Sequence, residues 1–278
     1  MDTIELVNLK KRFGSRWISK GINLSIPAEQ MTAIVGGSGE GKSVLLKMII
    51  GLLKPTSGRV LVEGTDIATL ADHELDNHYK KFGYVFQAAA LLDSLTVFEN
   101  IGLPLLEQGM SRRQVAPMLK EKLALVNLKE ECLKKYPSEL SGGMRKRVGL
   151  ARTLVTNPQI ILYDEPTTGL DPITTRVIHN LMHSMQQQLK LTSIVVSHDV
   201  EIFNYADNVA LLQDGQIRFF GSAQSVWQSN NPYIYQFIRG LAEGPIAIDP
   251  GTAEQAETRV LPSKFWRRKP SCRSTKTP

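Results

Sequence analysis

The sequence predicts an α/β fold with a mostly parallel sheet, on three observations. Short apolar runs typical of buried strands, such as 31–35 and 160–165, alternate with segments of helical periodicity. Residues 4–9 and 21–26 instead alternate apolar and polar positions, as half-buried antiparallel strands do. Asp214–Gly215 lies between two further strand-like runs and predicts a hairpin.

The remaining elements follow in chain order from the same patterns. A helix is predicted over about 42–53, where Pro55 and Gly58 break the pattern. From about 95 to 156 the periodicity is helical and interrupts the strand–helix alternation, so we expect an inserted α-helical subdomain at about 88–156. A further helix follows Pro172. The strands expected after the N-terminal pair are 31–35, 59–64, 82–87, 160–165 and 192–198.

Charge is distributed unevenly along the 278 residues. Six of the 33 basic residues lie between Lys264 and Pro278, where there is no acid, so the remaining 27 balance the 27 acids. A formally neutral body disfavours nucleic acid as a partner. The composition also divides the chain into a domain at 1–243 and a flexible extension at 244–278, whose basic KFWRRK segment either touches an anionic membrane or is solvated.

No run of eighteen apolar residues occurs, the start resembles no signal peptide, and the two cysteines lie far apart. We therefore expect a protein of a reducing cytoplasm without a membrane span of its own.

The stretch VGGSGEGKSVLL, residues 35–46, matches the G-x-x-x-x-G-K-[ST] pattern between a buried strand and a helix. Such a loop points successive N–H groups inward, toward the phosphates of a nucleotide. Lys42 would reach the β- and γ-phosphates and Ser43 would ligate Mg²⁺. Glu40 would contribute only its amide, and we expect its side chain to point outward, toward a dimer interface. The predicted nucleotide contacts in the loop are Gly36, Gly37, Ser38, Gly39, Glu40, Gly41, Lys42, Ser43 and Val44.

A second motif, IILYDE, places two acids at the carboxyl end of a buried strand, where open α/β sheets bind their ligands. Asp164 would hold Mg²⁺ and Glu165 would act as general base toward the attacking water. The two motifs together predict a P-loop NTPase with a RecA-like core, preceded by an N-terminal antiparallel β subdomain.

The stretch LSGGMRKRVGLART, residues 140–153, narrows this class. With the two preceding motifs it resembles the ATP-binding subunits of ABC transporters, whose signature reads Leu-Ser-Gly-Gly-Gln or a close variant. The resemblance runs from about Ile4 to Gly240. It implies a second phosphate site at the start of a helix, formed by Ser141, Gly142, Gly143 and Met144.

The resemblance assigns roles to four further residues. Gln87 matches the glutamine that senses Mg²⁺ and water, and His198 the switch histidine that contacts the γ-phosphate. Asp171, within TTGLDP, matches the acid of the D-loop. Phe13 matches the aromatic residue that stacks on adenine, although a core or surface aromatic residue would fit the sequence nearly as well. The implied catalytic residues are therefore Glu165, His198 and Gln87, and the implied metal ligands are Ser43, Gln87 and Asp164.

One loop and one signature in one chain imply a homodimer, because the family closes each ATP between two ATPase domains. The resemblance also implies transmembrane permease subunits. The apolar segment after Gln87 either contributes to the groove that receives them or packs into the chain's own core.

GKSVLLKMIIGLLKP, FQAAALLDSLTVFENI and SELSGGMRKRV are most similar to ATPases of the lipid-asymmetry, or Mla and MCE-associated, transporters. That resemblance implies a phospholipid or another hydrophobic cargo and, through the permease, an MCE-type lipid-binding protein. It places the chain at the cytoplasmic face of the inner membrane.

Two other classes of protein stay open. One is an ABC protein that works without a membrane partner, although such proteins usually carry two cassettes or a long coiled insertion. The other is a phosphotransferase, which would have no reason to carry the signature. Purification from native membranes tests the transport ATPase against both, because recovery only as a free protein would contradict a membrane partnership.

Overall fold

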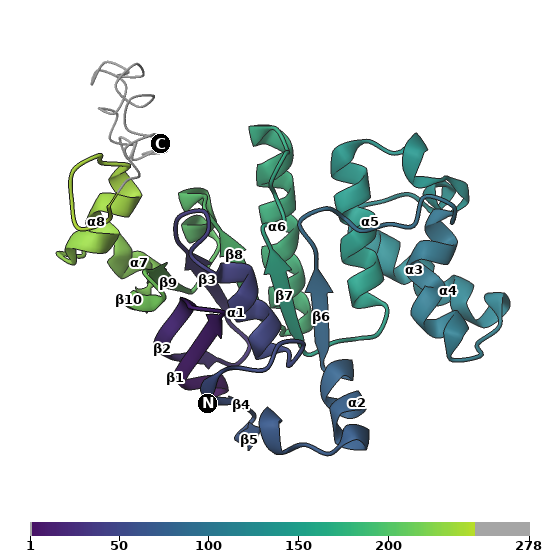
Figure 1. Ribbon diagram of the computed structural model, residues 1–278. Helices are drawn as coiled ribbons and strands as arrows, with labels where there is room; N and C mark the ends of the chain where they lie inside the picture. Colours follow the sequence, from purple (N-terminus) through teal and green to yellow (C-terminus); the bar gives the residue numbers. More distant parts are fainter. Residues whose placement is uncertain (1, 248–278) are drawn as a thin grey trace, which may run out of the picture.

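Two β-sheets form the framework of the chain, and the computed structural model describes them within residues 2–247 (Figure 1). The larger sheet has six strands in the order β10-β9-β3-β8-β7-β6, all parallel except β10. Its strands are β3 (Met31–Val35), β6 (Phe82–Val85), β7 (Ile160–Asp164), β8 (Thr192–Ser197), β9 (Asn208–Gln213) and β10 (Gln216–Ser222). The α/β class predicted from the sequence is confirmed.

The second sheet is antiparallel, with strand order β2-β1-β4-β5. It comprises β1 (Asp2–Phe13), β2 (Arg16–Pro27), β4 (Ser57–Val62) and β5 (Thr65–Asp66). Helix α1 (Lys42–Ile49) lies between the two sheets, in a core with buried residues of both, such as Ile26 and Ile34. α1 therefore has apolar neighbours on two sides, and its first turn is held firmly at the end of β3.

The opposite face of the larger sheet packs against α6 (Pro172–Leu189) and against the helices that follow β6. These helices are α3 (Val97–Glu107), α4 (Arg112–Leu125) and α5 (Gly142–Leu154), with 3₁₀ turns at Glu130–Lys134 and Pro137–Glu139. Figure 1 shows them grouped on the β6 side of the sheet. Both faces of the central strands are covered, which explains their continuous apolar runs.

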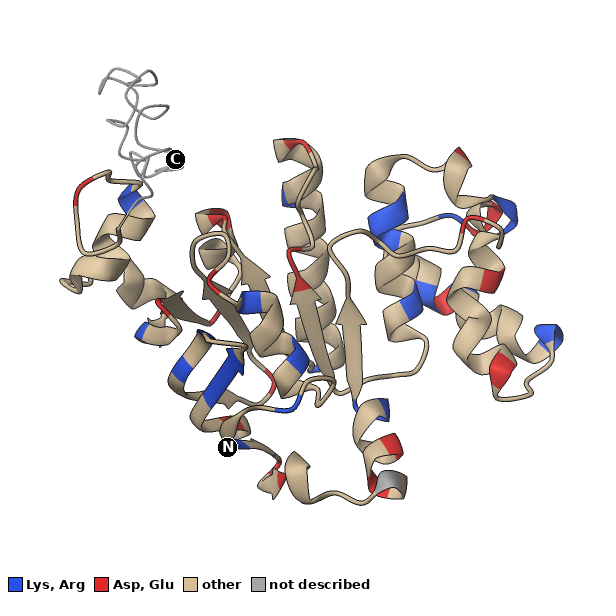
Figure 2. Cartoon of the chain, in the orientation of Figure 1, with Lys and Arg blue, Asp and Glu red and all other residues tan. Residues whose placement is uncertain are grey.

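Short helices complete the described chain. They are α2 (Asp72–Lys80) before β6, α7 (Ala223–Val226) and α8 (Pro232–Arg239) after β10, and 3₁₀ turns at Ile67–Thr69 and Val200–Asn204. Figure 2 shows basic and acidic residues interspersed over the chain in that view. Within residues 2–247, no helix combines the length and the apolar character needed to cross a membrane.

The largest differences from the predicted boundaries are at α1 and at the N-terminal strand pair. α1 ends at Ile49 rather than near residue 53, because Gly51 adopts a left-handed conformation with φ 88°. β1 and β2 extend well beyond 4–9 and 21–26, because their polar outer halves pair with each other, Phe13 opposite Arg16. The alternation rule detects only the half-buried part of such strands. The boundary at 243 stays a prediction, and the KFWRRK segment lies outside the described residues.

Candidate nucleotide site

The phosphate loop joins β3 to α1, and its glycines are required by its conformation. Gly39 and Gly41 have φ values of 81° and 89°, which L-residues with a side chain rarely adopt. At Gly36 a Cβ atom would lie 2.3 Å from the carbonyl oxygen of Leu212. The loop is thus curled tightly against β9, with α1 beginning directly after Gly41.

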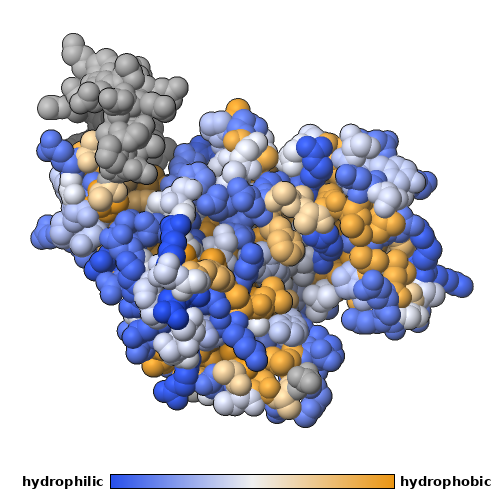
Figure 3. All heavy atoms as spheres, viewed as in Figure 1, coloured by the Kyte–Doolittle hydropathy of each residue, from blue (hydrophilic) through white to orange (hydrophobic). Residues whose placement is uncertain are grey.

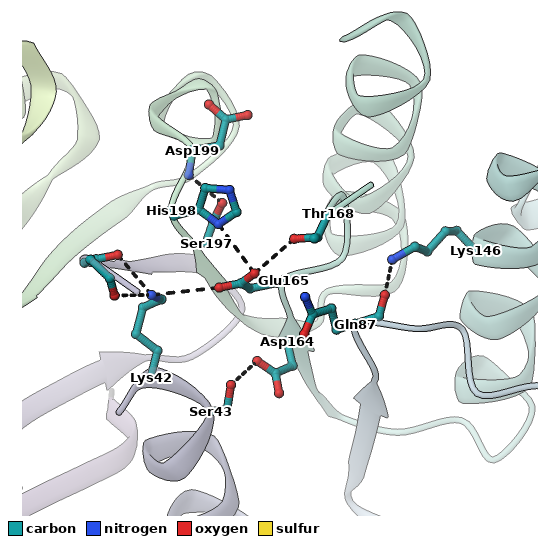
Figure 4. A network of polar contacts seen from close by, with 12 residues as sticks. Lys42, Ser43, Gln87, Lys146, Asp164, Glu165, Thr168, Ser197, His198 and Asp199 are labelled. Carbon is teal, nitrogen blue, oxygen red and sulfur yellow. Dashed lines mark hydrogen bonds and ion pairs between the residues drawn. The ribbon is translucent and has the colours of Figure 1, made fainter. Parts of the chain in front are cut away.

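The Lys42 ammonium group lies inside this curl (Figure 4). Its Nζ donates hydrogen bonds to the carbonyl oxygens of Gly36 (2.9 Å) and Gly37 (2.8 Å), and lies 3.9 Å from Oε1 of Glu165. Lys42 is 5 % exposed, and burial lowers its pKa, while the nearby Glu165 carboxylate opposes that shift. The loop therefore holds a concentrated positive charge where its amides converge.

Asp164 is the last residue of β7, and its carboxylate links the start of α1 to the neighbouring strand β6. Its Oδ1 accepts a hydrogen bond from Ser43 Oγ (2.7 Å) and its Oδ2 accepts one from the Tyr84 hydroxyl (2.9 Å). Burial and the Asp164 carboxylate together raise the pKa of Tyr84, so the phenol stays protonated and remains a donor. Ser43 and Asp164 together offer oxygen atoms of the kind that Mg²⁺ prefers.

Glu165 lies between Lys42 and His198. Its backbone is in the left-handed region, with φ 47°, and its N–H donates to the Val196 carbonyl oxygen (3.0 Å). Oε2 accepts from Thr168 Oγ1 (3.0 Å) and lies 3.4 Å from Nδ1 of His198. A strained backbone held by several partners is typical of functional positions. The structure thus brings Glu165 and His198 together, as the sequence led us to expect.

Gln87 follows β6, next to β7 in the sheet, so its position is adjacent to that of Asp164. Its backbone carbonyl oxygen accepts a hydrogen bond from Lys146 of α5. Six residues further along α5, Arg152 donates to the carbonyl oxygens of Ala89 (3.0 Å) and Ala90 (2.6 Å). Burial lowers the pKa of both basic residues. Two partly buried cations of α5 therefore fix the segment that carries Gln87.

The signature opens α5, away from the phosphate loop. Ser141 is the N-cap, and its Oγ accepts from the Met144 N–H (3.3 Å). Gly143 packs against Thr174 so closely that a Cβ atom there would lie 2.7 Å from its Cγ2. Asp171 caps α6, and its Oδ1 accepts from the N–H groups of Ile173 (3.0 Å) and Thr174 (2.9 Å). α5 follows the edge strand β6, which lies three strand spacings from β3, about 14 Å. Figure 1 shows α5 on the far side of β7 from α1, so the signature lies away from the phosphate loop of its own chain.

Phe13 lies at the tip of the β1–β2 hairpin. Its side chain is 49 % exposed, and the Lys11 ammonium lies 5.0 Å from the ring centroid. Exposure excludes the core-aromatic alternative. Trp17, 41 % exposed on the same hairpin, is a second accessible aromatic residue that the sequence did not single out.

The expectation for the Glu40 side chain is wrong. Rather than pointing away from its own chain, the carboxylate accepts hydrogen bonds from Gln213 Nε2 (2.9 Å) and from the Asp214 N–H (2.7 Å). The reason is the strand order, because β9 neighbours β3 and so brings the β9–β10 turn against the phosphate loop.

The apolar segment after Gln87 divides between two environments. Val97 and Ile101 are fully buried in the core, whereas Leu92 is 48 % exposed. Figure 3 shows hydrophobic residues also gathered on the visible surface of the helical group. Packing into the chain's own core is confirmed for Val97 and Ile101, whereas the groove for a permease subunit stays a prediction.

Sequence reasoning missed Tyr84, Thr168, Lys146 and Arg152 as supports of the site. Thr168 lies three residues from Glu165, a spacing that could have suggested the contact. The others have no local signal, since each depends on which strand or helix lies next to which.

The fold and the paired motifs define a P-loop NTPase with a nucleotide site at the carboxyl ends of β3 and β7. The ABC transporter family model matches residues 19–168, and the chain belongs to that family. The chain is an ATPase whose hydrolysis of ATP is coupled to transport.

Curated relatives support this membership. The probable ribonucleotide transport ATP-binding protein mkl of Mycobacterium tuberculosis is 40 % identical over 93 % of this chain and 73 % of its own length. The intermembrane phospholipid transport system ATP-binding protein MlaF of Haemophilus influenzae is 38 % identical over 87 % of this chain and 92 % of its own.

Solved structures agree with the fold. A dimeric post-hydrolysis state of the ATP-binding cassette MJ0796, bound to ADP and Pi, superposes with a TM-score of 0.72 at 34 % identity, covering 79 % of this chain and 98 % of that one. The cbiO1 protein of Clostridium perfringens, part of the ABC transporter complex cbiONQ, gives a TM-score of 0.76 at 28 % identity, covering 92 % and 99 %.

Proposed function

We propose that ATP binds with its adenine on Phe13 and its phosphates in the loop at 36–44. The observation that carries this proposal is the curled loop with the Lys42 ammonium in its centre, 3.9 Å from Glu165. Backbone amides and Lys42 hold the β- and γ-phosphates, which leaves Glu165 free to face the water that attacks the γ-phosphate. His198 contacts the γ-phosphate from the other side of Glu165.

Mg²⁺ fits the oxygen-rich end of β7. Ser43, Asp164 and Gln87 would hold it, and the ion would neutralise charge on the phosphate oxygens. Glu165 accepts the proton of the attacking water, and the Thr168 hydroxyl orients the Glu165 carboxylate for this role.

Tyr84 offers a test of the metal assignment. Tyr84→Phe removes the hydroxyl that donates to Asp164 and leaves the ring. Because that bond orients the carboxylate, we expect the Mg²⁺ concentration for half-maximal turnover to rise roughly tenfold. A magnesium titration of ATP hydrolysis measures it, with Tyr79→Phe on α2 as the matched control. An unchanged magnesium requirement would remove Asp164 from the metal site.

The nucleotide is completed by a second copy of the chain. Ser141 opens α5, which Figure 1 shows on the far side of β7 from α1 and the phosphate loop that precedes it. A two-fold pair uses the same patch twice, so the signature of each chain caps the nucleotide of the other. Closure of this pair, with Asp171 near the interface, is the step that drives transport through separate permease subunits.

The proposed cargo is a phospholipid or another hydrophobic molecule of the cell envelope. Its support is the MlaF relative, whose name states intermembrane phospholipid transport and which aligns over 92 % of its own length. Because the charges outside residues 264–278 balance, the chain gives no reason to propose nucleic acid as a further partner. Permease subunits, and through them an MCE-type lipid-binding protein, complete the assembly at the cytoplasmic face of the inner membrane.

Purification from native membranes in mild detergent tests the assembly. We expect the chain to co-purify with integral membrane proteins and with extractable phospholipid. Recovery only as a free protein would contradict the permease partnership.

The purified complex in vesicles then tests the cargo by ATP-dependent transfer of a fluorescent phospholipid. Uptake of a labelled ribonucleotide or of methionine instead would overturn the cargo but not the ATPase.

A further inference from the structure

Glu40, in the phosphate loop, makes a two-point contact with the turn between β9 and β10. One carboxylate oxygen accepts from Gln213 Nε2 at 2.9 Å, and the other accepts from the Asp214 N–H at 2.7 Å. Gln213 is 4 % exposed, so its amide group is a buried donor. Hydrogen bonds to a carboxylate are about twice as strong as those between neutral groups. The contact therefore joins the loop to a second element firmly.

That turn is itself fixed against the antiparallel sheet. Asp214 and Gly215 both have positive φ, 53° and 71°, as the two-residue turn requires. The Gly215 carbonyl oxygen accepts from the Lys20 N–H at 2.8 Å. A Cβ atom at Gly215 would lie 2.5 Å from the carbonyl oxygen of Ile18, so β2 and the turn are in close contact.

Strand β2 connects the β9–β10 turn to the hairpin that carries Phe13. The strand pairs with β1 along its length, and at the tip of the hairpin Phe13 lies opposite Arg16. Ile18 also lies against the loop itself, since a Cβ atom at Gly41 would be 2.4 Å from its Cγ2. The loop, the turn and the hairpin thus meet around Gly215 and Ile18.

We propose that Glu40 is a positioning residue whose carboxylate ties the phosphate loop to the β9–β10 turn and, through that turn, to the hairpin that carries Phe13. The two parts that grip a nucleotide, one at its phosphates and one at its base, are thereby held in a fixed relation before ATP arrives. This inference rests on the nucleotide site proposed above. It also explains how an acid is tolerated in the loop, because both of its oxygens are occupied by donors of the same chain.

A purely electrostatic role for Glu40 makes the opposite prediction. A carboxylate that acted only through its charge would repel the phosphates, so its removal would tighten ATP binding. If the carboxylate acts as a tether, its removal weakens ATP binding although a negative charge has gone. The sign of the change in Kd therefore distinguishes the two roles.

The test measures Kd by calorimetry on the full chain, with ATP and with tripolyphosphate. Glu40→Ala should raise the Kd for ATP roughly 5- to 30-fold. The Kd for tripolyphosphate should rise less, because tripolyphosphate has no base that could contact Phe13. Gln213→Ala removes the same contact from the other side and leaves the Glu40 charge, so it should also weaken ATP binding. The double variant should be no worse than Glu40→Ala alone.

Two further variants keep the outcomes distinct. Glu40→Gln preserves size and one acceptor, and should give an intermediate Kd for ATP. Lys42→Ala should lose affinity for both ligands; if it binds both normally, the proposed nucleotide site is wrong. If Lys42→Ala loses binding while Glu40→Ala binds ATP as well as or better than the parent chain, the positioning role alone is overturned. Additive effects in the double variant would overturn it too.

Discussion

Replacing Glu165 by Gln is expected to slow ATP hydrolysis by a factor of roughly 10² to 10⁴, while leaving the Kd for ATP close to that of the parent chain. The amide has the shape of the carboxylate but cannot accept the proton of the attacking water, and general bases typically contribute that factor. The Gln side-chain oxygen can still accept the Thr168 hydrogen bond, so the backbone at φ 47° keeps its support. Single-turnover hydrolysis and calorimetric binding together measure the two quantities.

The matched control is Glu131→Gln, an exposed acid in the helical group. It should hydrolyse ATP at the parent rate. Normal turnover by Glu165→Gln would remove Glu165 from the general-base role.

Replacing Lys42 by Ala is expected to weaken ATP binding roughly 10- to 100-fold. Hydrogen bonds to charged groups are each worth about 1.5–3 kcal/mol, and Lys42 carries the one ammonium group that the described residues place inside the curl of the loop. The loss should be as large for tripolyphosphate as for ATP, because it concerns the phosphates. Calorimetry at constant magnesium measures both constants.

Lys47→Ala serves as control, since Lys47 lies on the same helix and its side chain is exposed. It removes one positive charge without touching the loop and should bind ATP normally. Equal losses in the two variants would show that only the net charge of the helix matters.

Much of the framework could be predicted because it depends on local pattern. The strand at 31–35 was predicted with its observed bounds, since its five residues are all buried and all but one are apolar. The Asp214–Gly215 hairpin follows from turn chemistry. The phosphate loop could be located because its conformation requires glycines at fixed positions. Asp164 and Glu165 could be located because they directly follow the apolar run of a buried strand.

What could not be predicted depends on which elements become neighbours. Glu40 meets Gln213 because β9 lies beside β3, although the two residues are 173 positions apart. Tyr84 meets Asp164 because β6 lies beside β7. Nothing in the local sequence encodes that strand order, so a polar side chain on one strand does not reveal its partner on the next. The prediction that the Glu40 side chain points outward was wrong for this reason.

The central claim is that each nucleotide is completed by the signature of a second chain. Light scattering on the Glu165→Gln chain, with and without Mg²⁺ and ATP, tests it most directly. We expect the mass to double with ATP and each pair to retain two nucleotides. Ser141→Arg added to that chain should abolish the doubling and leave ATP bound to a single chain, because in the proposed pair Ser141 contacts only the nucleotide of the partner. If the Glu165→Gln chain with Ser141 intact binds ATP but does not double in mass, or if Ser141→Arg leaves the doubling unchanged, the account is contradicted.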